Sequence, residues 1–226
     1  PLRVDCDVAG VGDGRCYTGQ GMVRWRGGEG VAQVRIAMPG ATRWDVDAPH
    51  LYRAVVALRD AAGRVVDTAA VRFGLRTIAT RGRQVLLNGR PIFLRGACDD
   101  HVYPETVCPP ADPRFYRELI GNAKRYGFNY AKSASEVFTR EFLDAADELG
   151  YLVCQEMPCG GFGELRTIRQ AAPPAFRRLW REQVSNIVRF DRNHPAVIAY
   201  SLTSELPLDT PNPRPFRVFS RELPAL

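Results

Sequence analysis

Lysine is scarce in this chain, and no segment forms a cluster of basic residues. The formal net charge of +6 comes mainly from arginines that are scattered along the sequence. A nucleic-acid-binding surface usually needs a basic stripe, so nucleic acid is not an expected partner. The sequence also lacks any run of about 18 apolar residues, the length that a membrane-spanning helix needs, so a membrane is not an expected partner either. The composition is that of an ordinary folded protein with room for one large or two modest domains.

Pairs of cysteines at metal-binding spacing are also absent. None of the six cysteines is two residues from another, and none has a histidine nearby at zinc spacing. Asp45, Asp47 and His50 lie close together in sequence, but strand alternation and the turn at Pro49 favour surface and turn roles over a metal site. We expect no metal and no cofactor, and the cellular compartment stays open.

Residues 1–78 have the pattern of an all-β domain. Alternating apolar and polar residues predict strands over 31–38, 51–58 and 65–73, and Asp60–Gly63 predicts a hairpin turn. Several short strands at this spacing favour an antiparallel sandwich of immunoglobulin type. This part of the sequence contains no catalytic constellation.

Residues 79–226 alternate between strand and helix patterns, and they form the second predicted domain. The expected helices begin at Asp112 and Thr139, which are capping residues, and the second ends at Gly150. The predicted strands are 92–97, 128–132, 151–156 and 197–202, and the predicted helices are 112–126, 139–149 and 175–192. Four strands separated by helices predict a parallel sheet with right-handed crossovers, as in part of a β/α barrel of about four units.

The stretch NHPAVIAYSLTSE, from Asn193 to Glu205, contains a candidate catalytic residue. The residues predict a tight turn and then a short strand, whose unbroken apolar run is typical of a strand buried on both faces, and Glu205 follows that strand. The carboxyl ends of strands carry the active site in parallel β/α barrels, so Glu205 is a candidate catalytic carboxylate.

Three segments resemble glycoside hydrolase family 2, which includes β-galactosidase, β-glucuronidase and β-mannosidase. They are LLNGRPIFLRGA at 86–97, YGFNYAKSASEVFTREFLDAADELGYLVCQE at 126–156, and the stretch ending at Glu205. Residues 44–78 are similar to the end of that family's immunoglobulin-like middle domain. The resemblance implies an immunoglobulin-like domain followed by the first half of a TIM barrel. It also implies retaining hydrolysis of β-glycosidic bonds by two carboxylates about 5–5.5 Å apart.

The resemblance assigns the acid/base role to Glu205, with departures from the family pattern nearby. Ser204 stands where the family has an Asn that contacts the 2-hydroxyl of the sugar. Lys132 replaces an Arg, and the His residues that follow that Arg in the family are missing. These changes keep an alternative open, in which the chain is a non-catalytic carbohydrate-binding or scaffold relative.

The family nucleophile lies near the end of barrel strand seven, and the 226 residues contain no such unit. We therefore expect the chain alone to be inactive, with the barrel completed by another part of a longer polypeptide, by a homo-oligomer or by another chain.

Further substrate-binding candidates follow the first three barrel strands. Asp99, Asp100 and His101 can bind sugar hydroxyls, or they can form a loop that faces water and caps a helix. Gln155 and Glu156 close the third strand, where Glu156 is either a pocket residue or one half of a buried structural pair. The following loop, 157–164, has no His and is not expected to bind magnesium. The identity of the sugar stays open.

Overall fold

The computed structural model describes residues 2–12, 14–158 and 174–201, which divide into two units. The first unit comprises Pro1–Ile92 with Asn193–Pro195, and the second comprises Phe93–Arg192 with Ala196–Leu226. The predicted domains 1–78 and 79–226 remain a prediction.

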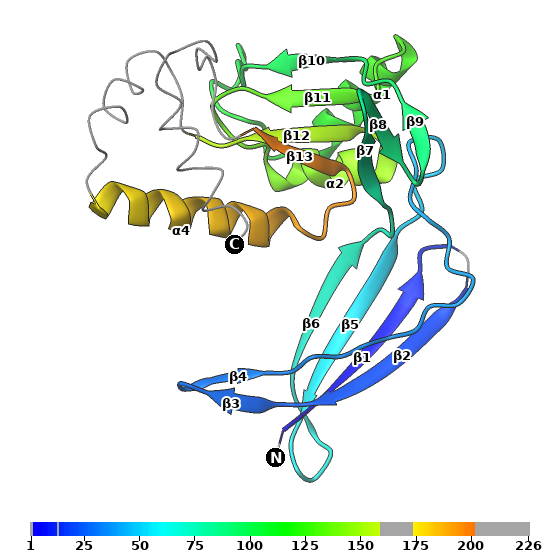
Figure 1. Ribbon diagram of the computed structural model, residues 1–226, viewed down its shortest axis with the longest axis vertical. Coiled ribbons are helices and arrows are strands. Elements are labelled where there is room, and N and C mark those ends of the chain that lie inside the picture. The colour runs from blue at the N-terminus through cyan, green and yellow to red at the C-terminus, as the bar shows by residue number, and fades with distance from the viewer. Residues whose placement is uncertain (1, 13, 159–173, 202–226) are drawn as a thin grey trace. The chain divides into compact units, whose positions relative to one another are not determined.

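An antiparallel sheet with the strand order β2-β1-β5-β6 forms the larger part of the first unit (Figure 1). Its strands are β1 (Arg3–Gly10), β2 (Cys16–Met22), β5 (Tyr52–Arg59) and β6 (Val65–Phe73), and a separate hairpin joins β3 (Arg24–Arg26) to β4 (Glu29–Val31). The turn predicted at Asp60–Gly63 is confirmed. The Asp60 carboxylate accepts hydrogen bonds of 2.9 Å from the Ala62 and Arg64 amides, and Gly63 has a φ of 82°.

The strand predicted over 31–38 is wrong, because residues 32–38 form no hydrogen-bonded strand. Ile36 and Met38 from this segment pack against the buried core of Val8, Tyr52 and Ala54. The alternating pattern therefore marks one buried face of an extended segment, and it does not require a hydrogen-bonded partner strand.

A three-stranded antiparallel sheet follows in the same unit, built from β7 (Ile78–Arg81), β8 (Gln84–Leu87) and β9 (Arg90–Ile92). Asn88 and Gly89 form the turn that joins β8 to β9, and both have the positive φ (52° and 81°) that a type I′ hairpin turn requires. The Asn88 side-chain amide donates to the Trp44 carbonyl at 3.0 Å, and it thereby ties the turn to a fully buried residue.

The second unit is a parallel sheet in which the strands lie in the order of the sequence (Figure 1). Its strands are β10 (Gly96–Asp99), β11 (Tyr130–Ser133), β12 (Leu152–Glu156) and β13 (Val197–Ser201), and its helices are α1 (Pro113–Arg125), α2 (Arg140–Leu149) and α4 (Pro174–Asp191). The predicted alternation of strands and helices and the parallel pairing are confirmed. The first strand lies later than predicted, which makes Asp99 the last residue of β10 and not a residue of the loop after it.

The predicted ends of α1 and α2 are confirmed. The Asp112 carboxylate accepts from the Arg114 amide at 2.9 Å, and Thr139 Oγ1 accepts from the Phe142 amide at 3.4 Å. Helix α2 ends at Gly150, which has a φ of 70°. The Lys124 ammonium of α1 donates to the carbonyls of Leu149 and Gly150, and its positive charge complements the carboxyl-terminal dipole of α2. No helix in the described part of the chain is long and apolar enough to cross a membrane.

Candidate functional site

Polar side chains gather at the carboxyl ends of β11, β12 and β13, around Glu156. This last residue of β12 is fully buried, and its carboxylate forms an ion pair with the Lys132 ammonium from β11. Glu156 Oε1 accepts from the Ser135 amide at 2.8 Å, and Oε2 accepts from the Ser201 hydroxyl at 3.3 Å. A buried carboxylate needs this kind of compensation, because loss of hydration would otherwise disfavour its charge.

Lys132 is the member of this pair that reaches solvent. Its side chain is 31% exposed, whereas the side chain of Glu156 is 0% exposed. The Lys132 ammonium also donates to the Ser133 carbonyl at 3.2 Å, and its third N–H has no partner among the described residues. The pair therefore presents an ammonium donor, and not a carboxylate, at the strand ends.

Gln155, the neighbour of Glu156 on β12, points to the opposite face of the sheet because side chains alternate along a strand. Its Oε1 accepts from the Phe138 amide at 2.9 Å, and its Nε2 donates to Asp191 Oδ2 at 3.1 Å, at the end of α4. Gln155 is fully buried. Sequence reasoning noted its place at the strand end but not this role, although a polar residue inside an otherwise apolar strand was the available signal.

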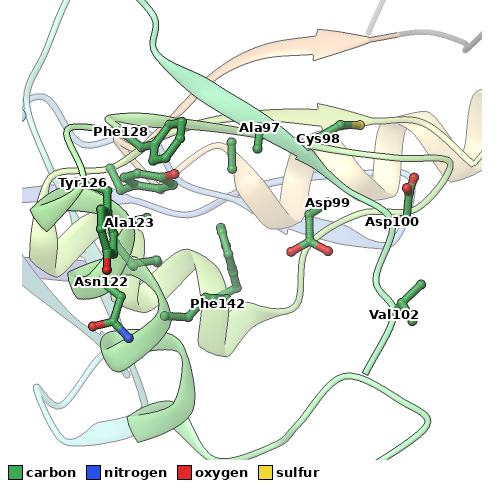
Figure 2. Close-up of a pocket in the computed structure, with 14 residues that line it drawn as sticks. Ala97, Cys98, Asp99, Asp100, Val102, Asn122, Ala123, Tyr126, Phe128 and Phe142 are labelled. Atoms are coloured by element: carbon green, nitrogen blue, oxygen red, sulfur yellow. The ribbon is translucent and has the colours of Figure 1, made fainter. Parts of the chain in front are cut away.

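Asp99 lies apart from the Lys132–Glu156 pair, on the side of β10 that faces α1. Figure 2 shows the Asp99 carboxylate turned toward the side of the strand on which Asn122 and Phe142 lie. Asp99 and Asp100 line a largely apolar cavity of about 530 Å³ there. Asp99 Oδ1 accepts from the His101 amide at 2.8 Å, which stabilises a local turn with a φ of 57° at His101. The structure thus brings Lys132 and Glu156 together and does not bring Asp99 to them. The substrate contacts of all these residues stay predictions.

Two tyrosines that are affected by the charge of Asp99, Tyr103 and Tyr151, have a raised pKa. Burial raises the pKa of Tyr103, and the nearby negative charge of Asp99 raises it further. Burial also raises the pKa of Tyr151 to about 12. Both phenols are therefore neutral near pH 7, where they can donate a hydrogen bond but cannot serve as a base.

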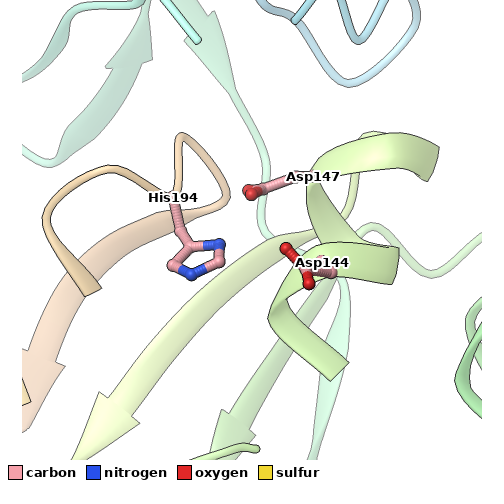
Figure 3. A group of neighbouring side chains, drawn as sticks. All are labelled: Asp144, Asp147 and His194. Carbon is pink, nitrogen blue, oxygen red and sulfur yellow. The ribbon is translucent and has the colours of Figure 1, made fainter. Parts of the chain in front are cut away.

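Two further aspartates lie on α2, and Figure 3 shows them. The buried Asp147 accepts a hydrogen bond of 3.0 Å from the Ala196 amide, directly before β13. Asp144 forms an ion pair with Arg140 at 3.8 Å on the same helix. Asp147 therefore secures the amino end of β13, whereas catalytic groups of a β/α barrel lie at the carboxyl ends of its strands.

Ser204 and Glu205 lie outside the described residues, as does loop 159–164. The strand that precedes them in sequence, β13, pairs in parallel with β12, and Glu156 is opposite Ser201 at the last paired position. The roles predicted for Ser204 and Glu205 stay predictions.

The fold and this polar cluster define a β/α-barrel segment preceded by an antiparallel sandwich. Residues 78–217 match the family description "Glycosyl hydrolases family 2, TIM barrel domain", and residues 16–76 match "Glycosyl hydrolases family 2". The chain belongs to glycoside hydrolase family 2. The predicted fold class, a sandwich followed by a partial TIM barrel, is confirmed.

Individual relatives agree with this assignment. The chain is 29% identical to a β-galactosidase of Photobacterium profundum over 163 residues, covering 72% of this chain and 16% of that protein. It is 30% identical to a β-galactosidase of Pseudoalteromonas haloplanktis over 172 residues, covering 75% of this chain and 16% of that protein. The chain thus spans about a sixth of the length of these curated relatives.

Solved structures share the fold. A β-glucuronidase from Ruminococcus gnavus superposes with a TM-score of 0.79 at 22% identity, covering 99% of this chain and 36% of that one. A glycosyl hydrolase family 2 member from Bacteroides cellulosilyticus has a TM-score of 0.76 at 24% identity, covering 90% of this chain and 26% of that one.

Proposed function

We propose that this chain forms the sandwich and the first half of the catalytic barrel of a retaining β-glycosidase, in which Glu205 is the acid/base. The observation that carries the proposal is the family match over 78–217, which includes the strand β13 and the Glu205 that follows it. A family 2 glycosidase protonates the departing oxygen with one carboxyl group and forms a glycosyl intermediate with another. Support for a carbohydrate substrate comes from relatives that are named β-galactosidases and β-glucuronidases.

Replacement of Glu205 by Gln tests the acid/base assignment, with the protein expressed from its complete reading frame. Turnover of aryl β-glycosides should fall by about 10²–10⁴-fold, which is the usual contribution of a general acid–base group. The loss should be smallest for substrates whose phenol leaves without protonation, because those bypass the acid. Glu182→Gln, an equivalent change at an exposed position of α4, is the control and should retain full activity. Equal activity of Glu205→Gln and wild type would remove Glu205 from this role.

The proposal extends to the second carboxylate. The family places its nucleophile near the end of the seventh barrel strand, and the structure describes four parallel strands in residues 93–201. Without a nucleophile the glycosyl intermediate cannot form, so the purified 226-residue chain should show no turnover of aryl β-glycosides. Turnover by that chain would contradict this part of the proposal. The oligomeric state of the active form can be measured by light scattering.

A non-catalytic carbohydrate-binding or scaffold relative is the second candidate. It is favoured by Ser204 and Lys132, which replace the Asn and the Arg of the family pattern. A relative of this kind would bind glycosides without hydrolysing them, and Glu205→Gln would leave the binding unchanged.

A further inference from the structure

The loop between β11 and α2 is held at its main chain by both neighbouring strands. The Ala134 amide donates to the Asp99 carbonyl at 3.0 Å, at the end of β10. From β12, Glu156 accepts from the Ser135 amide at 2.8 Å, and Gln155 accepts from the Phe138 amide at 2.9 Å. Two adjacent side chains that leave β12 in opposite directions therefore bind one loop of five residues, 134–138.

The loop has a conformation that needs this support. Ser135 has a φ of 57°, a left-handed value that costs free energy in residues other than glycine. Ser135 is exposed, so packing of its own side chain does not fix this conformation. The buried Phe138 stacks on Phe142 with ring centroids 3.8 Å apart, which anchors only the far end of the loop.

The groups that hold the loop are themselves enclosed. Glu156 and Gln155 are each 0% exposed. The carboxylate of Glu156 is occupied by Lys132, Ser135 and Ser201, and the amide of Gln155 bridges Phe138 to Asp191. Because Glu156 is fully enclosed, direct contact of its carboxylate with a sugar would require the displacement of the groups that cover it.

We propose that Gln155 and Glu156 form a clamp that positions the loop 134–138 and the Lys132 ammonium at the substrate-binding edge of the barrel. Glu156 is in this view a positioning residue, and Lys132, whose side chain is 31% exposed, is the group that meets a substrate hydroxyl. The inference rests on the proposed glycosidase function. It adds that Gln155 and Glu156 strengthen substrate binding indirectly, because they hold the loop 134–138 in place.

Amide hydrogen exchange tests the clamp without reference to activity. In Glu156→Gln, a single side-chain oxygen replaces two, so it cannot serve Ser135, Ser201 and Lys132 together. Exchange of the Ser135 amide should accelerate by about tenfold or more, because the hydrogen bond that protects it is weakened. Gln155→Met should accelerate exchange at Phe138 in the same way. Glu148→Gln is the control. It removes a carboxylate of α2 that pairs with Arg117 of α1 at 2.7 Å, and it should leave the exchange rates of the Ser135 and Phe138 amides unchanged.

Steady-state kinetics of the same variants, made in the protein from its complete reading frame, test the effect on substrate. Glu156→Gln should raise KM for an aryl β-glycoside by about tenfold, the loss expected for one charge-assisted hydrogen bond, with kcat changed less than about threefold. A merely structural role would lower the amount of active enzyme and the melting temperature but would leave KM unchanged. Lys132→Met should raise KM to the same extent, and Glu148→Gln should not.

The outcomes separate the two proposals. Unchanged exchange at Ser135 in Glu156→Gln would overturn the clamp. Faster exchange of the Ser135 amide with an unchanged KM would overturn the proposed effect of the clamp on substrate binding. A wild-type protein that hydrolyses no glycoside would contradict the proposed function, and the exchange data would then decide the clamp by themselves.

Discussion

Tyr52 shows at the scale of single residues what the pattern of a sequence predicts and what it omits. Alternation correctly predicts a strand over 51–58, and Tyr52 in it is fully buried. Its hydroxyl accepts from the Thr42 amide at 2.7 Å and donates to the Thr42 carbonyl at 3.1 Å, which no local pattern reveals. The same holds for Gln155 and the loop amide that it binds. Such partners are far apart in sequence and meet only through the tertiary fold.

Replacement of Tyr52 by Phe should lower the free energy of unfolding by about 1 kcal/mol, because the hydrogen bonds between the buried Tyr52 hydroxyl and the exposed Thr42 main chain are lost. Urea denaturation monitored by circular dichroism measures this change. Tyr126→Phe, at a side chain that is 83% exposed, is the matched control and should change stability by less than about 0.5 kcal/mol. Equal effects of the two substitutions would contradict the assigned role of the Tyr52 hydroxyl.

Cys154 should be the least reactive of the described cysteines in the folded protein. Burial raises the pKa of its thiol, and a raised pKa leaves a smaller thiolate fraction at any pH below it. Cys16, Cys98 and Cys108 are exposed. Labelling with an aromatic disulfide at pH 8, followed by mass spectrometry, should modify these three first. Cys154 should react as fast as they do in urea, and early labelling of Cys154 in the native state would refute the expectation.

At the scale of elements, capping residues predict the ends of helices more accurately than side-chain alternation predicts the positions of strands. Asp112, Thr139 and Gly150 mark helix ends because their side chains or backbone satisfy groups that every helix end exposes. The segment 31–38 was wrongly predicted as a strand, because side-chain alternation reports a buried face and says nothing about a partner strand. A displaced boundary at β10 likewise put Asp99 in a loop, although it lies in the strand and faces α1.

Gly150 provides a test of an element boundary. Its φ of 70° is unfavourable for residues with a Cβ atom, so Gly150→Ala should destabilise the second unit by about 1–2 kcal/mol. Gly150→Asn should cost less, because asparagine tolerates this region better than other non-glycine residues. Thermal unfolding of both variants gives the comparison, and a smaller loss for Ala than for Asn would show that backbone conformation does not govern this position.

At the scale of the whole molecule, family membership and fold class follow from the sequence, because several motifs occur in the family's order over most of the chain. The arrangement of the candidate site can be predicted from the sequence only in part. The sequence places Lys132 and Glu156 at the ends of two barrel strands, and the structure joins them in an ion pair, while their predicted substrate contacts stay predictions. The acid/base role of Glu205 stays a prediction, since that residue lies outside the described part.

The two lysines of the chain, Lys124 and Lys132, are both in the second unit, at the end of α1 and within β11. A protease that cuts only after lysine should spare the native protein, because both peptide bonds lie in hydrogen-bonded structure. After denaturation it should yield the fragments 1–124, 125–132 and 133–226, which mass spectrometry can identify. Rapid cutting under native conditions would show that the barrel segment opens readily. Digestion kinetics with this one enzyme would therefore report the opening of the barrel segment only, because the sandwich contains no lysine at which it could be cut.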